Sequence, residues 1–472
     1  MRYVSTRGLA PELGFEDVLL AGLARDGGLY VPKVWPVLSP AKIAGFAGKP
    51  FHEVAVEVLE PLTGGAVPRS DLVAMTQAAY ASFGHPAVTP LIQIAPNRFV
   101  LELFHGPTLA FKDVAMQLLA RLMDYVLAKR GARATIVGAT SGDTGGAAVE
   151  AFRSSTRADV FILFPDGRVS DVQRRMMTTP VAPHLHALSI AGNFDDCQAR
   201  VKDLFNNLAF RDRLQLSGVN SINWARIAAQ VTYYFVAAVA LGAPYRKVAF
   251  AVPTGNFGDI FAGHVARRMG LPIERLTIAT NSNDILTRTV RTGTYETRGV
   301  VATSSPSMDI QVSSNFERYL FEASGRDATK ISGFMANLKQ SGRFELGSAM
   351  AARLADDFGA VAASETAVAD TVRRVYDACG YLLDPHTACA AGSTLPSLGD
   401  VPEIILATAH PAKFPDAIES IVGIRPALPA RLNRLMTDLE HMTRLPNDIG
   451  VIEQFVAATS RVARPTSEGD QA

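Results

Sequence analysis

The order of apolar and polar positions along the chain predicts strands that alternate with helices. From about residue 97 onward, a run of consecutive apolar residues is followed each time by a short loop and then by helical spacing. Continuous apolar runs are typical of parallel strands that helices cover on both faces. We therefore predict an α/β fold with parallel-rich sheets. The apolar runs are RFVLELF (98–104), ATIVGAT (134–140), DVFILFP (159–165), KVAFAVP (247–253) and EIILATAH (403–410).

The first part of the chain has another pattern and predicts an extra N-terminal domain. A short helix, FEDVLLAGLARDGG, is expected to end at Gly27 and Gly28, followed by the strand LYVP and by helices over 51–60 and 70–83. With 472 residues the chain is too long for one compact core. The predicted segments are an N-terminal domain (1–95), a smaller α/β domain with a lysine motif (96–200), a larger α/β domain with a glycine loop (201–430), and a C-terminal helix with a disordered polar tail, RVARPTSEGDQA (431–472).

Composition and charge exclude several functional classes. Hydrophobic residues make up 48% and charged residues 19% of the chain, as in well-packed globular proteins. The net charge is +1 without a long Lys/Arg run, which argues against binding to nucleic acid through phosphate neutralisation. The longest apolar run, residues 231–244, is too short to span a bilayer, and no apolar signal region follows the N-terminus. We therefore expect no nucleic acid and no membrane as partner.

Cysteine and histidine usage argues against disulfides and metals. Cys197, Cys379 and Cys389 are few and widely spaced, which is typical of a reducing compartment and predicts a cytoplasmic protein. The histidines lack the spacing of a metal site, although DPHTA (384–388) is suggestive. We expect no metal. The histidines considered are His105, His264, His386 and His410.

The motif HGPTLAFKD (105–113) places a lysine at the head of a predicted helix. Lys112 lies on the apolar stripe of that helix, whereas Asp113 begins a polar stripe. The apolar stripe continues through Met116, Leu119, Met123 and Val126, and the polar stripe through Gln117, Arg121 and Asp124. Burial disfavours the ammonium form, and the neutral amine is the form that attacks a carbonyl to make a Schiff base. The alternative is a lysine whose ammonium simply reaches solvent from the helix start.

The loop TGNFGD (254–259) follows an apolar strand and precedes a helix. Its glycines allow backbone N–H groups to approach a ligand closely, and a helix start is an anion site. The loop lacks a Walker lysine and the spacing G-x-G-x-x-G, so a phosphate monoester fits better than a nucleoside triphosphate or a dinucleotide. The alternative is a tight turn in which Gly258 only relieves strain.

A second strand-to-helix loop, GATSGDTGG (138–146), is rich in hydroxyl and acidic side chains. Ser141, Asp143 and Thr144, together with Thr140, suit the binding of a carboxylate through N–H and O–H donors. The strongest rival interpretation is a dinucleotide site in which Asp166 binds ribose, but the glycine spacing differs from that motif.

Two residues near the end of the last predicted strand are further candidates. Thr408, in LATAHPAKF (406–414), lies at the mouth of a strand, although most strand-end threonines are structural. Lys413 is a rival for the Schiff-base lysine, but it lies in an ordinary loop-to-helix junction.

An inward lysine, a loop for a phosphate monoester and a loop for a carboxylate together outline a pyridoxal-phosphate (PLP) enzyme that handles an amino acid. From residue 1 to about 425 the chain resembles threonine synthase of the microbial and fungal type. The motifs that carry the resemblance are MRYVSTRG, DGGLYVP, HGPTLAFKD, TSGDTGGAA, RVSDVQRRMMTT, NSINWARIAAQVTYYF, PTGNFGD, SMDIQVSSNFER and ATAHPAKF.

The resemblance implies a fold-type II architecture, as in tryptophan synthase β, and the conversion of O-phospho-L-homoserine and water to L-threonine and phosphate. It implies that Lys112 carries PLP and moves protons, and that Thr408 faces the pyridine nitrogen. The residues that would hold the 5′-phosphate are Gly255, Asn256, Phe257, Gly258 and Asp259. Ser141, Asp143 and Thr144 would lie on the substrate side, although Asp143 stands where related enzymes often have asparagine.

Several alternatives stay open at this point. The chain can be a serine/threonine dehydratase or a phospholyase of the same architecture, or a ligand-binding descendant without activity, although the last should lack Lys112. Arg174 and Arg226 are candidates for the substrate phosphate by charge alone. We expect a small-molecule substrate and a monomer or homodimer.

Overall fold

The computed structural model describes residues 1–393 and 395–463, which form two compact units. The larger unit contains Met1–Leu19, Leu23–Ala115 and Ser221–Leu428. The smaller unit contains Leu20–Gly22, Met116–Asn220 and the chain from Pro429 onward. Each unit is built around its own sheet.

The larger unit has a six-stranded sheet in the order β14-β11-β10-β15-β5-β4. Its strands are β4 (Leu91–Ala95), β5 (Arg98–Glu102), β10 (Val248–Pro253), β11 (Ile273–Thr280), β14 (Phe358–Ala362) and β15 (Glu403–Ala407). Every neighbouring pair is parallel except β4 and β5, which are antiparallel. The register places Ala251 of β10 beside Ile405 of β15. All six residues of β10 are buried, which confirms the prediction of parallel strands covered on both faces.

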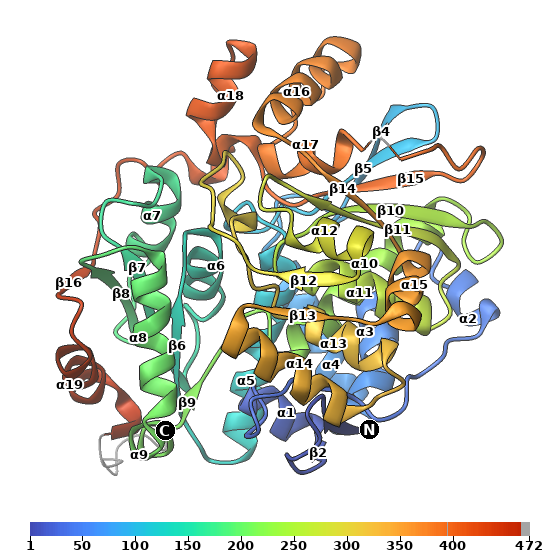
Figure 1. The fold of residues 1–472 in the computed structure, drawn as a ribbon. Helices are drawn as coiled ribbons and strands as arrows, with labels where there is room; N and C mark the ends of the chain where they lie inside the picture. Colours follow the sequence, from blue (N-terminus) through green and yellow to red (C-terminus); the bar gives the residue numbers. More distant parts are fainter. Residues whose placement is uncertain (394, 464–472) are drawn as a thin grey trace. The chain divides into compact units, whose positions relative to one another are not determined.

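Helices cover both faces of this sheet (Figure 1). Helices α10 (Trp224–Ala240) and α11 (Gly258–Arg268) lie on one side, and α16 (Glu365–Cys379), α17 (Pro385–Ala391) and α18 (Pro415–Val422) lie on the other. The second side shares one hydrophobic core with the strands, formed by residues such as Val100, Ala251, Ile405, Val372 and Ala388. Figure 1 thus shows a helix–sheet–helix arrangement within this unit.

Apart from Leu20–Gly22, the first 80 residues join the larger unit rather than forming a unit of their own. Their elements are β1 (Arg2–Ser5), β2 (Leu13–Gly14), α1 (Phe15–Ala21), β3 (Tyr30–Pro32), α2 (Pro40–Ala44), α3 (Phe51–Thr63) and α4 (Arg69–Tyr80). Helices α3 and α4 match the predicted helices closely, and α3 packs on α10. Trp224 of α10 also donates a hydrogen bond of 3.0 Å from Nε1 to the hydroxyl of Tyr3.

The rest of the larger unit follows β11 and lacks a counterpart among the predicted elements. It comprises α12 (Ile285–Thr292), the antiparallel pair β12 (Thr294–Glu296) and β13 (Arg343–Glu345), α13 (Phe316–Ala323), α14 (Ala328–Ser341) and α15 (Ser348–Asp357). Helix α12 packs on β11 and β14, so this segment is also part of the sheet's cover.

The smaller unit has a five-stranded parallel sheet in the order β16-β8-β7-β6-β9. Its strands are β6 (Ala134–Ala139), β7 (Ala158–Pro165), β8 (Leu185–Ile190), β9 (Leu216–Ser217) and β16 (Thr443–Leu445). Its helices are α6 (Asp143–Ala151), α7 (Asp171–Thr178), α8 (Phe194–Asn206), α9 (Leu208–Arg213) and α19 (Ile449–Thr459). Helix α8 packs on β6 and β7, and α19 packs on α8.

The two units divide the chain differently from the four consecutive segments predicted from the sequence. The border crosses helix α5 (Lys112–Lys129) after Ala115, so Lys112 belongs to the larger unit. The C-terminal segment belongs to the smaller unit because β16 pairs with β8. Periodicity along a sequence marks elements, whereas the units are set by pairings between distant segments.

The prediction of a disordered tail over residues 461–472 is wrong for its first three residues. Arg461–Ala463 forms a turn of 3-10 helix, and Arg461 Nε donates to Asp159 Oδ1 at 2.6 Å. The rest of that tail, residues 464–472, lies outside the described residues. No helix in the described part of the chain is long and apolar enough to cross a bilayer.

Candidate active site

Lys112 is the first residue of α5 and is half-buried. Its Nζ donates a hydrogen bond of 3.3 Å to Ser307 Oγ and lies 5.5 Å from the centre of the Phe111 ring. The apolar stripe predicted below it is fully buried, since Met116, Leu119, Met123 and Val126 are all 0% exposed. The polar stripe is also buried at its start, because Asp113 is 0% and Gln117 3% exposed. The helix is therefore covered on both stripes.

Buried polar groups hold the loop that ends in Lys112. The carboxylate of Asp113 accepts hydrogen bonds of 2.7 Å from the backbone N–H and from the hydroxyl of Thr108. Gly106 is needed there, because a Cβ would collide with Asp113. Burial raises the pKa of Asp113, and the hydrogen bonds from Thr108 and the charge of Lys413 act against that rise.

Lys413 has a structural contact to the same loop. It ends the turn Pro411–Lys413, is 1% exposed, and donates a hydrogen bond of 2.9 Å from Nζ to the carbonyl of Thr108. As predicted from the sequence, Lys413 lies in a loop-to-helix junction, just before α18, and its ammonium is buried there. Its contact explains how a buried cation is tolerated without chemistry.

The loop between β10 and α11 presents backbone donors. Phe257 caps α11 in the left-handed conformation with φ +62°. The carbonyl of Gly255 accepts from Ser313 Oγ at 2.7 Å, and the carbonyl of Asn256 accepts from the Asn315 N–H at 3.0 Å. Within the described part of the chain, the N–H groups of 255–258 donate to no acceptor. The carbonyls are therefore engaged and the N–H groups are left for an anion, as at other helix starts.

Position 255 requires a glycine, because neighbouring backbone leaves little room for a side chain. A Cβ at this position would lie 3.0 Å from the carbonyl oxygen of Ser307 and 3.2 Å from Cα of Met308. The loop and the segment that carries Ser307 are thus in direct backbone contact, which links the predicted phosphate loop to the partner of Lys112.

Asp259, also predicted at this loop, uses its carboxylate elsewhere. Its Oδ1 accepts hydrogen bonds from the hydroxyls of Tyr233 at 2.5 Å and Tyr234 at 3.0 Å. The side chain is 6% exposed, and burial raises the pKa of Asp259 to about 6. Only the backbone N–H of Asp259 is then suited to a phosphate.

Thr408 follows β15 and lies beside the lysine loop. Its carbonyl accepts the Phe111 N–H at 2.9 Å, and Ala110 forms an antiparallel bridge with Ala409. The hydroxyl of Thr408 makes no recorded hydrogen bond within the described chain. A free hydroxyl beside the residue that precedes Lys112 suits a contact with a bound group.

The donor set of the larger unit fits PLP. A phosphate monoester matches the open N–H groups of 255–258, an aldehyde matches the amine of Lys112, and a ring nitrogen matches the hydroxyl of Thr408. The aldehyde and the phosphate-bearing group of PLP are on adjacent carbons of one small ring, which agrees with the backbone contact at Gly255 between the loop and the segment of Ser307.

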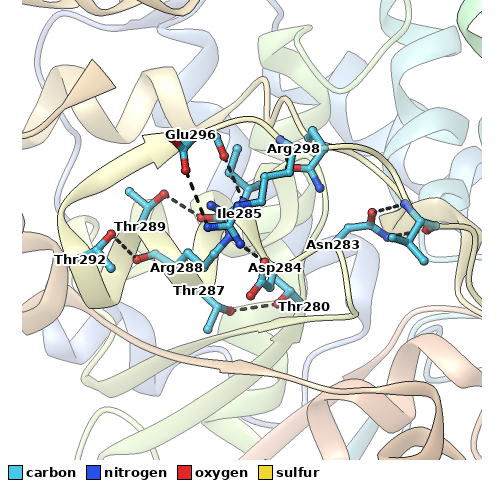
Figure 2. A network of polar contacts seen from close by, with 12 residues as sticks. Thr280, Asn283, Asp284, Ile285, Thr287, Arg288, Thr289, Thr292, Glu296 and Arg298 are labelled. Atoms are coloured by element: carbon cyan, nitrogen blue, oxygen red, sulfur yellow. Dashed lines mark hydrogen bonds and ion pairs between the residues drawn. The ribbon is translucent and has the colours of Figure 1, made fainter. Parts of the chain in front are cut away.

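A polar network fixes the chain that leads from β11 toward Ser307 (Figure 2). The hydroxyls of Thr280 and Thr287 are 2.9 Å apart. Arg288 Nε donates to Asp284 Oδ1 at 2.8 Å, and its Nη2 donates to the carbonyl of Glu296 at 3.0 Å. Helix α12 is thereby tied to the end of β11 and to β12.

The second predicted loop belongs to the smaller unit. Asp143 is the first residue of α6 and is 5% exposed, and its Oδ1 accepts a hydrogen bond of 2.9 Å from Gln173 Nε2. Ser141 and Thr144 are half-buried. Thr140 Oγ1 accepts from the N–H groups of Gly142 and Gly145, so it shapes the turn.

Other predicted residues have contacts that bear on their roles. Arg174 donates to Glu440 at 2.8 and 3.0 Å and to Asp171 at 2.6 Å, so its guanidinium is committed to carboxylates. Arg226 is 3% exposed on α10, and burial lowers its pKa to about 10. Asp166 accepts a hydrogen bond from Ser189 Oγ at 2.8 Å. Within residues 1–393 and 395–463, no group of three or more His, Cys, Asp or Glu is placed to hold a metal ion.

Sequence reasoning missed Ser307, and it considered His386 and Asp384 only within DPHTA, as a weak candidate for a metal site. Ser307 N–H donates to His386 Nε2 at 3.3 Å, and His386 Nδ1 lies 2.9 Å from Asp384 Oδ1. The available signal was DPHTA, in which Asp384 and Pro385 have the pattern of a helix start. Nothing local in that pattern connects it with Ser307, 79 residues earlier.

Three family models match the chain. The model "Threonine synthase N terminus" matches residues 2–80, "Pyridoxal-phosphate dependent enzyme" matches residues 83–404, and "Threonine synthase, C-terminal" matches residues 387–456. Together they cover almost the whole chain, and the second alone covers more than half of it.

Individual proteins agree with the family models. Threonine synthase of Pseudomonas aeruginosa is 50% identical over 469 residues, which cover 98% of this chain and 100% of that protein. The crystal structure of PLP-bound threonine synthase from Brucella melitensis has a TM-score of 0.95 and 59% identity, covering 98% of this chain and 100% of that one. Yeast threonine synthase has a TM-score of 0.92 and 36% identity, covering 97% and 98%. The chain therefore belongs to the threonine synthase family of fold-type II, pyridoxal-phosphate-dependent enzymes.

Proposed function

We propose the residue roles through which this chain converts O-phospho-L-homoserine and water to L-threonine and phosphate, the reaction of its family. Lys112 binds PLP covalently, the N–H groups of 255–258 and of Asp259 bind its 5′-phosphate, and Thr408 faces its pyridine nitrogen. The observation that carries these roles is the loop at Gly255 and Asn256, whose carbonyls are engaged by Ser313 and Asn315 while its N–H groups stay open.

Bound PLP supplies an electron-withdrawing ring that makes the protons of an attached amino acid removable. With PLP bound, the amine of Lys112 would be the base and acid of the chain for these protons, because it would lie at the aldehyde end of the cofactor site. Thr408 is a neutral partner for the ring nitrogen. It does not favour the protonated ring as a carboxylate would, and the site is thereby biased against transamination.

We assign Ser141, Asp143 and Thr144 to the substrate side. The N-terminal turn of α6 supplies backbone donors for a carboxylate, and the hydroxyls of Ser141 and Thr144 are partly open to solvent. Arg174 is less suited to the substrate phosphate than its charge suggests, because Glu440 and Asp171 already bind it.

A cytoplasmic location and a monomeric or homodimeric state complete the proposal. The three cysteines are all free, as expected in a reducing compartment. The partner is a small-molecule substrate.

The test is a product assay on the purified holoenzyme with O-phospho-L-homoserine. We expect phosphate and L-threonine in equal amounts, and no turnover by Lys112→Ala. A dehydratase or phospholyase would instead release an oxo-acid and ammonia, and that result would contradict the proposal.

A further inference from the structure

A chain of three hydrogen-bonded residues, buried at Asp384 and His386 and partly exposed at Ser307, ends at the amine of Lys112. Lys112 Nζ donates to Ser307 Oγ at 3.3 Å, Ser307 N–H donates to His386 Nε2 at 3.3 Å, and His386 Nδ1 lies 2.9 Å from Asp384 Oδ1. We propose that His386 and Asp384 are positioning residues, which hold the hydroxyl of Ser307 where it orients the amine of Lys112 for attack on an aldehyde. This inference rests on the proposed role of Lys112.

Asp384 fixes the tautomer of His386. A carboxylate only accepts hydrogen bonds, so the proton of the imidazole is on Nδ1 and Nε2 is an acceptor. An acceptor is what the Ser307 N–H requires. The opposite tautomer would place two N–H groups against each other. The pair therefore determines the orientation of the backbone at Ser307.

The pair itself is held rigidly. Asp384 is 1% and His386 3% exposed, and Asp384 caps α17 by accepting from the backbone N–H groups of His386 at 2.9 Å and Thr387 at 3.3 Å. The hydroxyl of Thr387 also donates to Asp384 Oδ2. The ring of Phe414 packs on the imidazole at 5.0 Å between centres. Little freedom is left for the imidazole to turn.

Ser307 is also fixed from its other side. Asn283 Nδ2 donates to the carbonyl of Val301 at 2.8 Å, and Val301 N–H donates to Asn283 Oδ1 at 2.9 Å. Asn281 Nδ2 donates to Asp309 Oδ1 at 2.7 Å. The segment on both sides of Ser307 is thus anchored, with Asn283 next to the network of Figure 2. The hydrogen bond from the Ser307 N–H to His386 is a further contact within this anchored segment.

An oriented neutral amine is the reactive form of a lysine toward an aldehyde: its nitrogen bonds to the aldehyde carbon, and the aldehyde oxygen leaves as water with the two amine protons, which leaves a C=N bond. Ser307 Oγ accepts one N–H of that amine, and this directs the nitrogen lone pair away from the hydroxyl. The side chain of Lys112 loses less conformational entropy when the covalent bond forms, because the hydrogen bond to Ser307 already restrains it. Removal of this contact should slow the bond formation without weakening the phosphate contacts at 255–258.

The experiment measures how fast PLP-free full-length protein forms its visible chromophore after addition of PLP. We expect Ser307→Ala and His386→Leu to be slower than wild type by about tenfold, the usual effect of one hydrogen bond to a group that can be charged. His386→Gln keeps an acceptor near the position of Nε2 and should recover most of the rate. The double variant S307A/H386L should be no slower than either single variant, because both act through one path.

Two controls separate positioning from general damage. Thr387→Val removes a hydrogen bond from the other oxygen of the same carboxylate and should stay within about twofold of wild type. 4′-Deoxypyridoxine 5′-phosphate, which has the phosphate and ring but no aldehyde, should bind wild type and all variants equally. Equal rates for Ser307→Ala and wild type, or equal losses in Thr387→Val and His386→Leu, would overturn the inference. A wild-type protein that forms no chromophore would instead contradict the proposed function.

Discussion

The buried ammonium of Lys413 donates a hydrogen bond of 2.9 Å to the carbonyl of Thr108, within the loop that ends in Lys112. The side chain of Asp113, which is 0% exposed, also holds this loop, because its carboxylate accepts a hydrogen bond from the backbone N–H of Thr108. One lysine thus supports the loop and the other is exposed to the site. The two lysines that compete for a chemical role in the sequence have separate functions in the structure.

Lys413→Met should destabilise the protein. The change removes a buried ammonium whose charge favours the ionised form of the buried Asp113, and loss of such a buried charge partner costs about 3–5 kcal/mol. Urea unfolding of the holoenzyme measures the loss. Lys247→Met is the control, because Lys247 forms an exposed pair with Glu274 at 2.6 Å and such pairs contribute about 0–1 kcal/mol. Equal stability of Lys413→Met and wild type would refute the structural role.

Gly255→Ala should weaken PLP binding by about tenfold or more, since the added Cβ would press on the carbonyl oxygen of Ser307 at 3.0 Å and displace the loop. Equilibrium dialysis with PLP gives the affinity. Gly333→Ala in α14 meets no atom within 4 Å and should leave the affinity unchanged. Unchanged affinity in Gly255→Ala would mean that this loop does not bind the phosphate.

Asp259 should make the protein less stable as the pH rises from about 4 to 6. Burial raises the pKa of Asp259 from 3.8 to about 6, so the folded state binds a proton that the unfolded state has lost. This contribution to stability is present in full below the pKa of Asp259 in the unfolded state, and it is lost as the pH rises through the pKa of Asp259 in the folded state. At about 1.4 kcal/mol per pH unit, the loss is roughly 3 kcal/mol at most.

The variant Asp259→Asn isolates that effect. It keeps an acceptor for Tyr233 and Tyr234 but has no charge to bury. Its stability relative to wild type should therefore increase between pH 4 and pH 7, measured by denaturant unfolding at each pH. A difference between the two proteins that does not change with pH would show that Asp259 does not titrate in this range.

Thr408→Asp should raise transamination relative to threonine formation. A carboxylate at this position would favour a protonated ring nitrogen, whereas the hydroxyl of Thr408 does not. Oxo-acid and threonine are measured in the same reaction, with Thr408→Ser as the control that keeps a hydroxyl. Transamination in wild type at a rate comparable to threonine formation would contradict the assignment of Thr408.

Local signals predicted the lysine motif and the glycine loop, because their chemistry depends on neighbours in sequence. A strand, a glycine turn and a helix start at 254–259 are readable from composition alone. The structure adds why the loop donates rather than accepts: Ser313 and Asn315 engage its carbonyls, and they come from a segment almost 60 residues later.

Other features depend on pairings that one sequence does not display. The carboxylate of Asp259 is next to the phosphate loop in sequence, yet its direction is set by two tyrosines of α10. The units could not be predicted as consecutive segments, because β16 near the C-terminus pairs with β8. Ser307 and His386 meet through a hydrogen bond from the backbone N–H of Ser307, which side-chain patterns in the sequence do not indicate.

The central claim is that PLP is bound covalently by Lys112. Borohydride reduction of the holoenzyme, followed by proteolysis and mass spectrometry of the labelled peptide, tests it most directly. We expect one pyridoxyl group per chain, on Lys112 in the peptide that contains HGPTLAFKD. A label on Lys413, or a protein that carries no reducible PLP, would contradict it.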